Sequence, residues 1–432
     1  MVMAIVLIFS LASCKEAVSS SDHPEDYVFT LKYHDDFYIL QLTDIHWNAN
    51  TPTIASMSYL DKLLKEVNDH IISIQGASAK IDLVELTGDL FMLANTYHLD
   101  TFIDYFENNI LIPRGLNYKL MFPNPTGTNA IEMAIKLARK NKKRSNIFAL
   151  MGAFHGMTLG SLALTTEKGA REGAGVTLNN VTHIAPPYYM NNTFNTIEYM
   201  KEILHDDHCG IEKPAAIILE TVQAEGGIYA FSKEFLQDLR KLCDEEDILL
   251  IVDDVQVGCA RTGTFFSFER ANIKPDMVVM SKSIGGYGMP LSLVLIKPEL
   301  DIFNPGEHNG TFRGFQLSMV TAKAALEFVL NNNIEAEVKR KERIVSEYLN
   351  TNIKPLLKEN MCFRGIGLIW GIEFNDGKLS RSVLDRCFEK GLIIELAGRN
   401  DSVLKIMPAL TIEDELLIKG LDIIKESIKE IL

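Results

Sequence analysis

The chain has 432 residues, of which 47% are hydrophobic and 23% are charged, a balance typical of a globular protein with two or three domains. Its formal net charge of -14 repels polyanions, which argues against nucleic acid or an anionic membrane surface as a partner. The six cysteines are scattered without Cys-x-x-Cys pairs, which argues against a disulfide framework and a zinc site.

Residues 1–20 predict a segment that is separate from the fold. A short apolar run ends in Leu11-Ala12-Ser13-Cys14 and is followed by serines, which resembles a bacterial lipoprotein signal peptide with its lipobox. No Lys or Arg precedes the run, although such signals begin with positive charge. An exported protein anchored through Cys14 is therefore one alternative for its location.

Residues 21–95 predict a βαβ unit of a different fold from the rest of the chain. Apolar strand patterns at 37–43 and 81–87 flank helical periodicity at 59–74. Residues of metal-binding types follow the two strands: Asp44, His46 and Asp89. This arrangement resembles the start of calcineurin-like metallophosphoesterases, but the Asn-His and Gly-His-x-His motifs that complete such a site are absent from the sequence. We therefore expect a truncated fragment, with a metal-dependent phosphoesterase as an alternative function.

From about residue 96 the sequence alternates between strand and helix patterns. This predicts an α/β large domain at 96–320, with a mostly parallel sheet covered by helices on both faces. The expected strands are apolar throughout, as strands buried on both faces are: 147–151, 216–219, 248–252, 277–280 and 291–296. Helices are expected at 130–140, 196–204 and 233–245. A smaller α+β domain is expected at 321–432, in which a long helical stretch from 319 leads to 366–374, 403–406 and a final amphipathic helix from 412.

Two patterns in this half suit the phosphate and the ring of a cofactor. A turn of small residues at 125–129 precedes a helix, whose first N–H groups and dipole favour a phosphate, although ordinary capping is the commoner reason for such a turn. Phe154-His155-Gly156 follows a predicted strand. An aromatic side chain there can stack on a flat heteroaromatic ring, and a buried core phenylalanine is the alternative.

Two further patterns supply charge and a nucleophile. Asp253 follows an apolar strand, and a buried carboxylate needs a cation such as a protonated pyridine nitrogen; helix capping and metal binding are the alternatives. Lys282 lies between two serines after another apolar strand. That position suits a lysine that bonds to an aldehyde cofactor better than a solvated surface lysine.

These patterns together resemble the class III, fold-type I aminotransferases over nearly all of residues 96–432. The blocks that carry the resemblance are 110–132, 152–165, 213–227, 248–269 and 305–314. The resemblance is strongest to the branch that acts on diaminobutyrate and 2-oxoglutarate in ectoine synthesis. It implies a pyridoxal 5′-phosphate cofactor and a homodimer with shared active sites.

The same resemblance implies a role for each matching residue. Lys282 would carry the cofactor and move the proton, while Asp253 would pair with the pyridinium nitrogen. The other implied cofactor contacts are Gly127 and Thr128 at the phosphate, Phe154 stacked on the ring, Gln256 at the ring hydroxyl, and Thr311 at the phosphate of the neighbouring subunit. Three residues would lie toward the substrate: Glu220, Glu225 and Lys405. Lys405 stands where many relatives have an arginine for the substrate carboxylate, and a lysine attracts a carboxylate only as a point charge.

The implied reaction moves an amino group from L-2,4-diaminobutyrate to 2-oxoglutarate, giving aspartate 4-semialdehyde and glutamate. Relatives carry about ninety further residues before the matching block, where this sequence has the phosphoesterase-like segment. A protein that binds the cofactor without turnover is therefore a further alternative. An enzyme supplied with glutamate is expected in the cytosol.

Overall fold

The computed structural model describes residues 97–432 except Tyr287, together with five short strands before residue 97. The chain divides into two compact units, Met1–Thr96 and Tyr97–Leu432. The strands described in the first unit are β1 (Ile8–Phe9), β2 (Ile39–Leu42), β3 (Ile72–Ile74), β4 (Ala77–Ala79) and β5 (Leu83–Leu86). β2 and β5 pair in parallel within the two predicted strands. The predicted lipobox and the residues Asp44, His46 and Asp89 lie outside the described residues.

The helix predicted at 59–74 in the first unit is wrong at its C-terminal end. Residues 72–74 were expected to finish a helix, but Ile72–Ile74 is a strand that pairs antiparallel with Ala77–Ala79. β-Branched isoleucines that alternate with serine favour an extended chain, and the adjacent strand supplies the hydrogen bonds.

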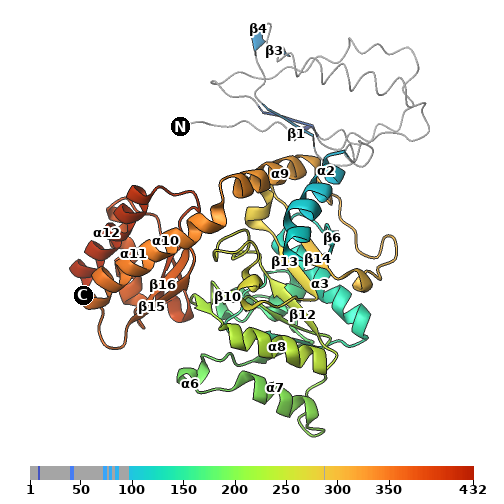
Figure 1. Ribbon diagram of the computed structural model, residues 1–432, viewed down its shortest axis with the longest axis horizontal. Helices are drawn as coiled ribbons and strands as arrows, with labels where there is room; N and C mark the ends of the chain where they lie inside the picture. Colours follow the sequence, from blue (N-terminus) through green and yellow to red (C-terminus); the bar gives the residue numbers. More distant parts are fainter. Residues whose placement is uncertain are drawn as a thin grey trace. The chain divides into compact units, whose positions relative to one another are not determined.

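The second unit is built on a seven-stranded sheet (Figure 1). Its strands, in spatial order, are β6 (Lys119–Met121), β14 (Leu293–Ile296), β13 (Met277–Met280), β12 (Leu249–Asp253), β9 (Ala216–Leu219), β7 (Ile147–Leu150) and β8 (Val181–Ile184). All neighbours from β13 to β8 pair in parallel, whereas β14 runs antiparallel to both β13 and β6. The mostly parallel sheet was predicted, but the reversed β14 was not, because an apolar run does not encode its direction.

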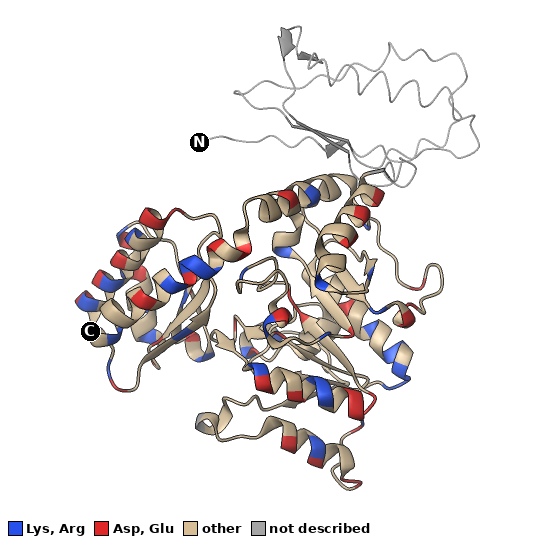
Figure 2. Cartoon of the chain, viewed as in Figure 1, with Lys and Arg blue, Asp and Glu red and all other residues tan. Residues whose placement is uncertain are grey.

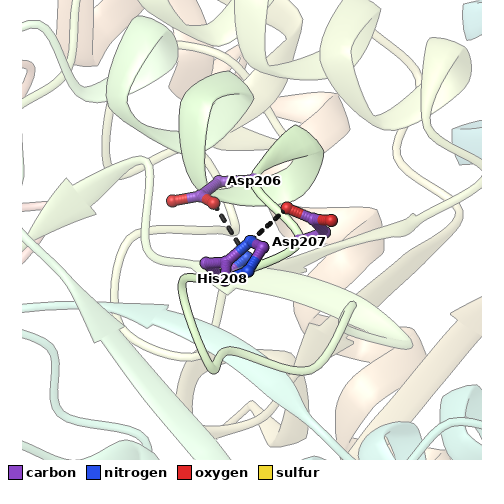
Figure 3. Close-up of side chains that lie close together, drawn as sticks. All are labelled: Asp206, Asp207 and His208. Carbon is purple, nitrogen blue, oxygen red and sulfur yellow. Dashed lines mark hydrogen bonds and ion pairs between the residues drawn. The ribbon is translucent and has the colours of Figure 1, made fainter.

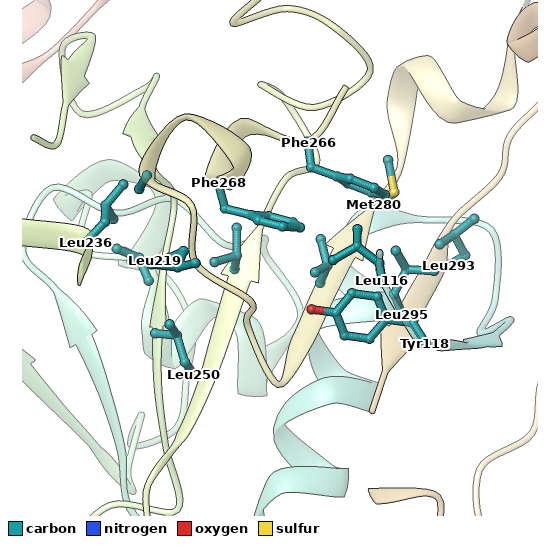
Figure 4. Close-up of a cluster of buried hydrophobic side chains, with 14 of the residues drawn as sticks. Leu116, Tyr118, Leu219, Leu236, Leu250, Phe266, Phe268, Met280, Leu293 and Leu295 are labelled. Carbon is teal, nitrogen blue, oxygen red and sulfur yellow. The ribbon is translucent and has the colours of Figure 1, made fainter. Parts of the chain in front are cut away.

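Side chains of these strands alternate between two buried layers. On β12, for example, Leu250 and Val252 belong to one hydrophobic cluster, while Leu249 and Ile251 belong to the other. The alternation follows from the two-residue period of a strand, and it explains why every residue of β12 is buried. Figure 4 shows the first layer, where leucines of β9, β12 and β14 meet Phe266 and Phe268.

Helices cover both faces of this sheet. α3 (Gly127–Lys142) packs its alanines and aliphatic residues into the second layer. The first layer is closed by α2 (Tyr97–Phe106), α7 (Thr196–His205), α8 (Lys233–Glu245) and α9 (Gln316–Asn331). Shorter elements complete the large domain: α4 (Leu159–Leu164), α5 (Lys168–Arg171), α6 (Tyr189–Asn192), β10 (Val222–Gln223) and β11 (Tyr229–Ala230). Figure 2 shows acidic and basic residues interspersed along the helices.

The C-terminal part of the unit carries its own sheet. Four strands lie in the order β15 (Cys362–Ile366), β16 (Ile369–Glu373), β18 (Val403–Ile406) and β17 (Glu395–Ala397), all antiparallel. The helices of this part are α10 (Ile334–Tyr348), α11 (Gly377–Glu389) and α12 (Asp414–Ile431). The helical stretch expected from residue 319 is two helices, because Asn333 takes a left-handed conformation with φ of 48° between α9 and α10. Among the described residues, no helix is long and apolar enough to cross a membrane.

The buried core of the sheet predicts that two leucines contribute very differently to the free energy of unfolding. Leu250 on β12 has no exposed surface, whereas Leu416 on α12 is 54% exposed. We expect Leu250→Ala to lower the free energy of unfolding by about 2–5 kcal/mol, because it leaves a cavity among close-packed side chains. Leu416→Ala should lower it by less than about 0.5 kcal/mol. Urea denaturation followed by circular dichroism measures both, and equal losses would contradict the placement of the core.

Candidate active site

A cavity of about 340 Å³ is lined by eight of the ten predicted cofactor and substrate residues. These are Gly127, Thr128, Phe154, Glu220, Glu225, Asp253, Gln256 and Lys282. They come together because the carboxyl ends of parallel strands meet at one edge of a sheet. β7, β9, β12 and β13 all end at this edge, and the residues that follow each strand form the wall.

Asp253 is the last residue of β12, at the centre of the sheet, and only 4% of it is exposed. His155 donates its Nδ1–H to Asp253 Oδ2 at 2.7 Å, and the backbone N–H of Val255 donates to Asp253 Oδ1 at 3.1 Å. Burial lowers the pKa of His155, but the hydrogen bond and the charge of Asp253 outweigh it and raise that pKa above its ordinary value. The sequence pattern that contains His155 predicts no role for it, whereas the structure shows it as the direct partner of Asp253.

Glu220 follows β9 and holds two segments of the cavity wall together. Its carboxylate accepts hydrogen bonds from the backbone N–H groups of Phe154 at 3.0 Å and Ala224 at 3.3 Å. Burial raises the pKa of the Glu220 carboxyl to about 7. The residue lines the cavity as expected, while its oxygens are engaged with the backbone.

Lys282 begins the short 3₁₀ turn Lys282–Gly285 after β13, and its side chain lines the same cavity as Asp253. Its φ of 51° lies in the left-handed region, which is unfavourable for a residue with a side chain and costs about 1–3 kcal/mol. Such a backbone persists when the surroundings fix it, and it is typical of functional positions.

Gly127 and Thr128 are the first residues of α3 and lie at another wall of the cavity. The preceding Thr126 caps the helix by accepting a hydrogen bond from the backbone N–H of Asn129. A methyl group on Gly127 would lie 3.1 Å from Val255 Cγ1, so the glycine permits close packing at this point. The start of a helix beside a cavity suits an anionic group, because its N–H groups point outward.

Gln256 connects the cavity with a charged cluster. Its side-chain Nε2 donates to Glu225 Oε1 at 3.1 Å, and Lys405 Nζ lies 2.9 Å from the same oxygen. Lys405 Nζ also lies 2.8 Å from Glu395 Oε2. Burial lowers the pKa of Lys405, but its hydrogen bonds to Glu395 and Glu225 raise it above the ordinary value. Burial alone would raise the pKa of Glu225, but the hydrogen bonds from Lys405 and Gln256 outweigh burial, so the pKa lies below its ordinary value.

Lys405 and Thr311 are the two predicted residues that do not line the first cavity. Lys405 lines a second cavity of about 460 Å³, which Gln256 and Lys282 also line, so the two cavities share a wall. Thr311 is exposed and lines neither cavity. Its contact with a neighbouring subunit therefore stays a prediction.

Three exposed residues of types that bind metals, Asp206, Asp207 and His208, lie directly after α7 and line neither cavity (Figure 3). Asp206 Oδ1 accepts from the backbone N–H of His208 at 2.8 Å, which closes the turn. The side chains of Asp207 and His208 are both 89% exposed, so the cluster is explained as a solvated turn.

Comparisons with known proteins identify the family of the chain. Residues 100–428 match the family model described as aminotransferase class-III. A diaminobutyrate--2-oxoglutarate transaminase of Bordetella parapertussis is 47% identical over 333 residues, which cover 77% of each chain. A transaminase of the same name from Sporosarcina pasteurii is 44% identical over 373 residues, covering 86% of this chain and 84% of the relative.

The fold has solved counterparts as well. One is the taurine:2-oxoglutarate aminotransferase of Bifidobacterium kashiwanohense in complex with PLP and glutamate, with a TM-score of 0.69 and 21% identity. The match covers 77% of this chain and 79% of that structure. The chain therefore belongs to the class III aminotransferase family, and it is an aminotransferase. Enzymes of this family depend on pyridoxal phosphate.

Asp254, next to Asp253, predicts a specific dependence of stability on pH. It is 2% exposed, and burial raises its pKa from 3.8 to about 7. Between these values the unfolded chain releases the proton while the folded chain retains it, so stability falls as the pH rises. We expect Asp254→Asn to remove this contribution. The free energy of unfolding of the variant should then fall less between pH 5 and pH 7 than that of the wild type, by a difference on the order of 1 kcal/mol. Urea midpoints of both proteins at the two pH values measure it, and parallel changes would contradict a protonated Asp254.

Proposed function

We propose that this protein catalyses pyridoxal-phosphate-dependent transamination between L-2,4-diaminobutyrate and 2-oxoglutarate. The observation that carries the proposal is that Asp253, which ends β12, and Lys282, which follows the neighbouring parallel strand β13, line one cavity of about 340 Å³. A cofactor ring between these two residues can contact the carboxylate of Asp253 at one edge and the primary amine of Lys282 near the opposite edge. The names of the relatives support the choice of substrates.

The residues of the cavity fit this cofactor. The carboxylate of Asp253 already accepts two hydrogen bonds, but a carboxylate offers about four acceptor positions, so it can accept another from a pyridinium N–H. Among the described residues the buried Gln256 Oε1 has no hydrogen-bond partner. Its amide carries two N–H donors, of which Glu225 takes one, so a donor remains for a ring hydroxyl. Phe154 supplies an aromatic wall, and the first residues of α3 supply a phosphate-binding end.

When bound, pyridoxal phosphate accepts the amino group and withdraws electrons from the carbon that carried it. In this assignment Asp253 maintains a negative charge beside the ring nitrogen, and His155 orients the carboxylate through its hydrogen bond. Lys282 would hold the cofactor at rest, and its Nζ would take the proton from the substrate carbon that bears the amine. Gln256 connects the ring side of the cavity with Glu225 and Lys405 on the substrate side.

Three further parts of the proposal follow from the family. We infer a homodimer in which Thr311 reaches the phosphate of the partner subunit. We also infer that Lys405 meets a substrate carboxylate and that the enzyme works in the cytosol, where glutamate is available. The phosphoesterase alternative depends on Asp44, His46 and Asp89, which lie outside the described residues.

Lys282→Ala tests the proposal. Protein loaded with pyridoxal phosphate should absorb at about 410–430 nm, and this band should be lost in the variant because no amine remains at that position. Glutamate formation from diaminobutyrate and 2-oxoglutarate should fall by roughly 10³-fold or more. Lys358→Ala, at an exposed lysine outside both cavities, is the matched control and should retain the band and the activity.

The outcomes separate the alternatives. A wild-type band without glutamate formation would indicate a protein that binds the cofactor without turnover. A band that survives in Lys282→Ala would contradict the assignment of the lysine. Release of nitrophenol from a phosphate ester with added manganese, abolished by Asp44→Asn, would support the phosphoesterase instead.

A further inference from the structure

Glu395 and Lys405 form a matched pair at the edge of the C-terminal sheet. They are directly opposite each other in the antiparallel pairing of β17 with β18, so their side chains lie on the same face. Lys405 Nζ lies 2.8 Å from Glu395 Oε2. On the other side of Lys405 the paired residue is Gly371, which has no side chain to compete for the ammonium group.

The same face is held against the cavity of the large domain. The backbone N–H of Gly398, just after β17, donates to the Glu225 carbonyl at 2.9 Å. Ala397 and Val403 of this face pack with Val222 and Ile228 of the large domain in one buried cluster. Glu395 and Lys405 therefore have a fixed position relative to Glu225.

The three charged side chains differ in exposure. The Lys405 side chain is only 4% exposed and that of Glu225 is 36% exposed, whereas that of Glu395 is 72% exposed. Glu225 accepts from both Gln256 and Lys405, so its position is fixed by two donors. Among the residues that the structure describes, Lys405 is the ion-pair partner of Glu395, which lines the cavity of about 460 Å³ that Lys282 also lines. Glu395 is thus the more accessible of the two carboxylates.

The charges of the cluster do not balance. Glu225 and Glu395 share the one ammonium group of Lys405, so these three side chains together have an excess of one negative charge. Lys282 is a further basic side chain on the same cavity wall. An α-amino acid end carries a carboxylate and an ammonium group on one carbon, which complements a neighbouring lysine and glutamate. A dicarboxylate has no group that Glu395 can attract.

We propose that Glu395 binds the α-ammonium group of the amino donor while Lys405 binds its α-carboxylate, which makes the site selective for diamino acids. The inference rests on the proposed transamination and assigns its donor specificity to a residue that no sequence pattern singled out. An ω-amino acid without the α-ammonium would leave Glu395 facing its carboxylate, and the repulsion would weaken its binding.

Two donors that differ by one group test this specificity. L-2,4-diaminobutyrate and 4-aminobutyrate share the reacting amine and the carboxylate, but only the first has an α-ammonium. In Glu395→Gln holoenzyme, kcat/KM for diaminobutyrate should fall by about 10–100-fold through KM, because a hydrogen bond to a charged group is lost. The value for 4-aminobutyrate should stay the same or rise. Glu395→Asp should restore part of the preference, and Glu359→Gln, which removes an exposed carboxylate outside both cavities, should leave both donors unchanged.

A binding measurement separates failure of this inference from failure of the proposed function. Calorimetric titration of the intact chain with L-2-aminobutyrate and with butyrate compares the same carboxylate with and without the α-ammonium. Wild type should prefer L-2-aminobutyrate, and Glu395→Gln, with an unchanged melting temperature, should lose that preference. If wild type transaminates diaminobutyrate but the variant still prefers L-2-aminobutyrate over butyrate, the role of Glu395 is overturned and the activity stands. If wild type prefers L-2-aminobutyrate and the variant loses that preference, but no donor is transaminated, the Glu395 site stands and the proposed reaction fails.

Discussion

A carboxylate at the end of the central strand is the constraint around which the site is organised. Asp253 lies in the middle of a seven-stranded sheet with 4% of its surface exposed, where an unpaired negative charge is strongly unfavourable. His155 and the backbone N–H of Val255 stabilise it directly. The remaining acceptor capacity faces a cavity that Lys282 also lines. A cationic ring nitrogen in that cavity would complete the balance of charge, and the sheet provides the rigidity that keeps acid and amine in place.

The buried acids around Asp253 show how the fold maintains this arrangement. Glu220 and Asp254 both lie within a few residues of a strand end, and burial raises the pKa of each to about 7. Glu220 accepts the backbone N–H of Phe154, which lines the cavity, and Asp254 accepts the backbone N–H of Ser267. Glu220 and Asp254 therefore act as anchors for the backbone next to Asp253.

Much of this site could be predicted from the sequence, because its residues follow apolar strands. The strand patterns at 216–219 and 277–280 match β9 and β13 residue for residue, and parallel pairing then places the following polar residues at one edge. What could not be predicted depends on contacts distant in sequence. β6 and β8 are partly exposed, so they lack the continuous apolar pattern of the buried strands. The partnership of His155 with Asp253, and of Glu395 with Lys405, arises only when separate segments meet in space.

The central claim is that the amine at position 282 is the group to which pyridoxal phosphate bonds, opposite Asp253. Borohydride reduction of the loaded protein fixes the cofactor to its lysine, and mass spectrometry of the resulting peptides then identifies that lysine among all those in the chain. The account predicts the added mass on the peptide that contains Lys282 and on no other. Labelling of a different lysine, or no labelling of the loaded protein, would contradict it.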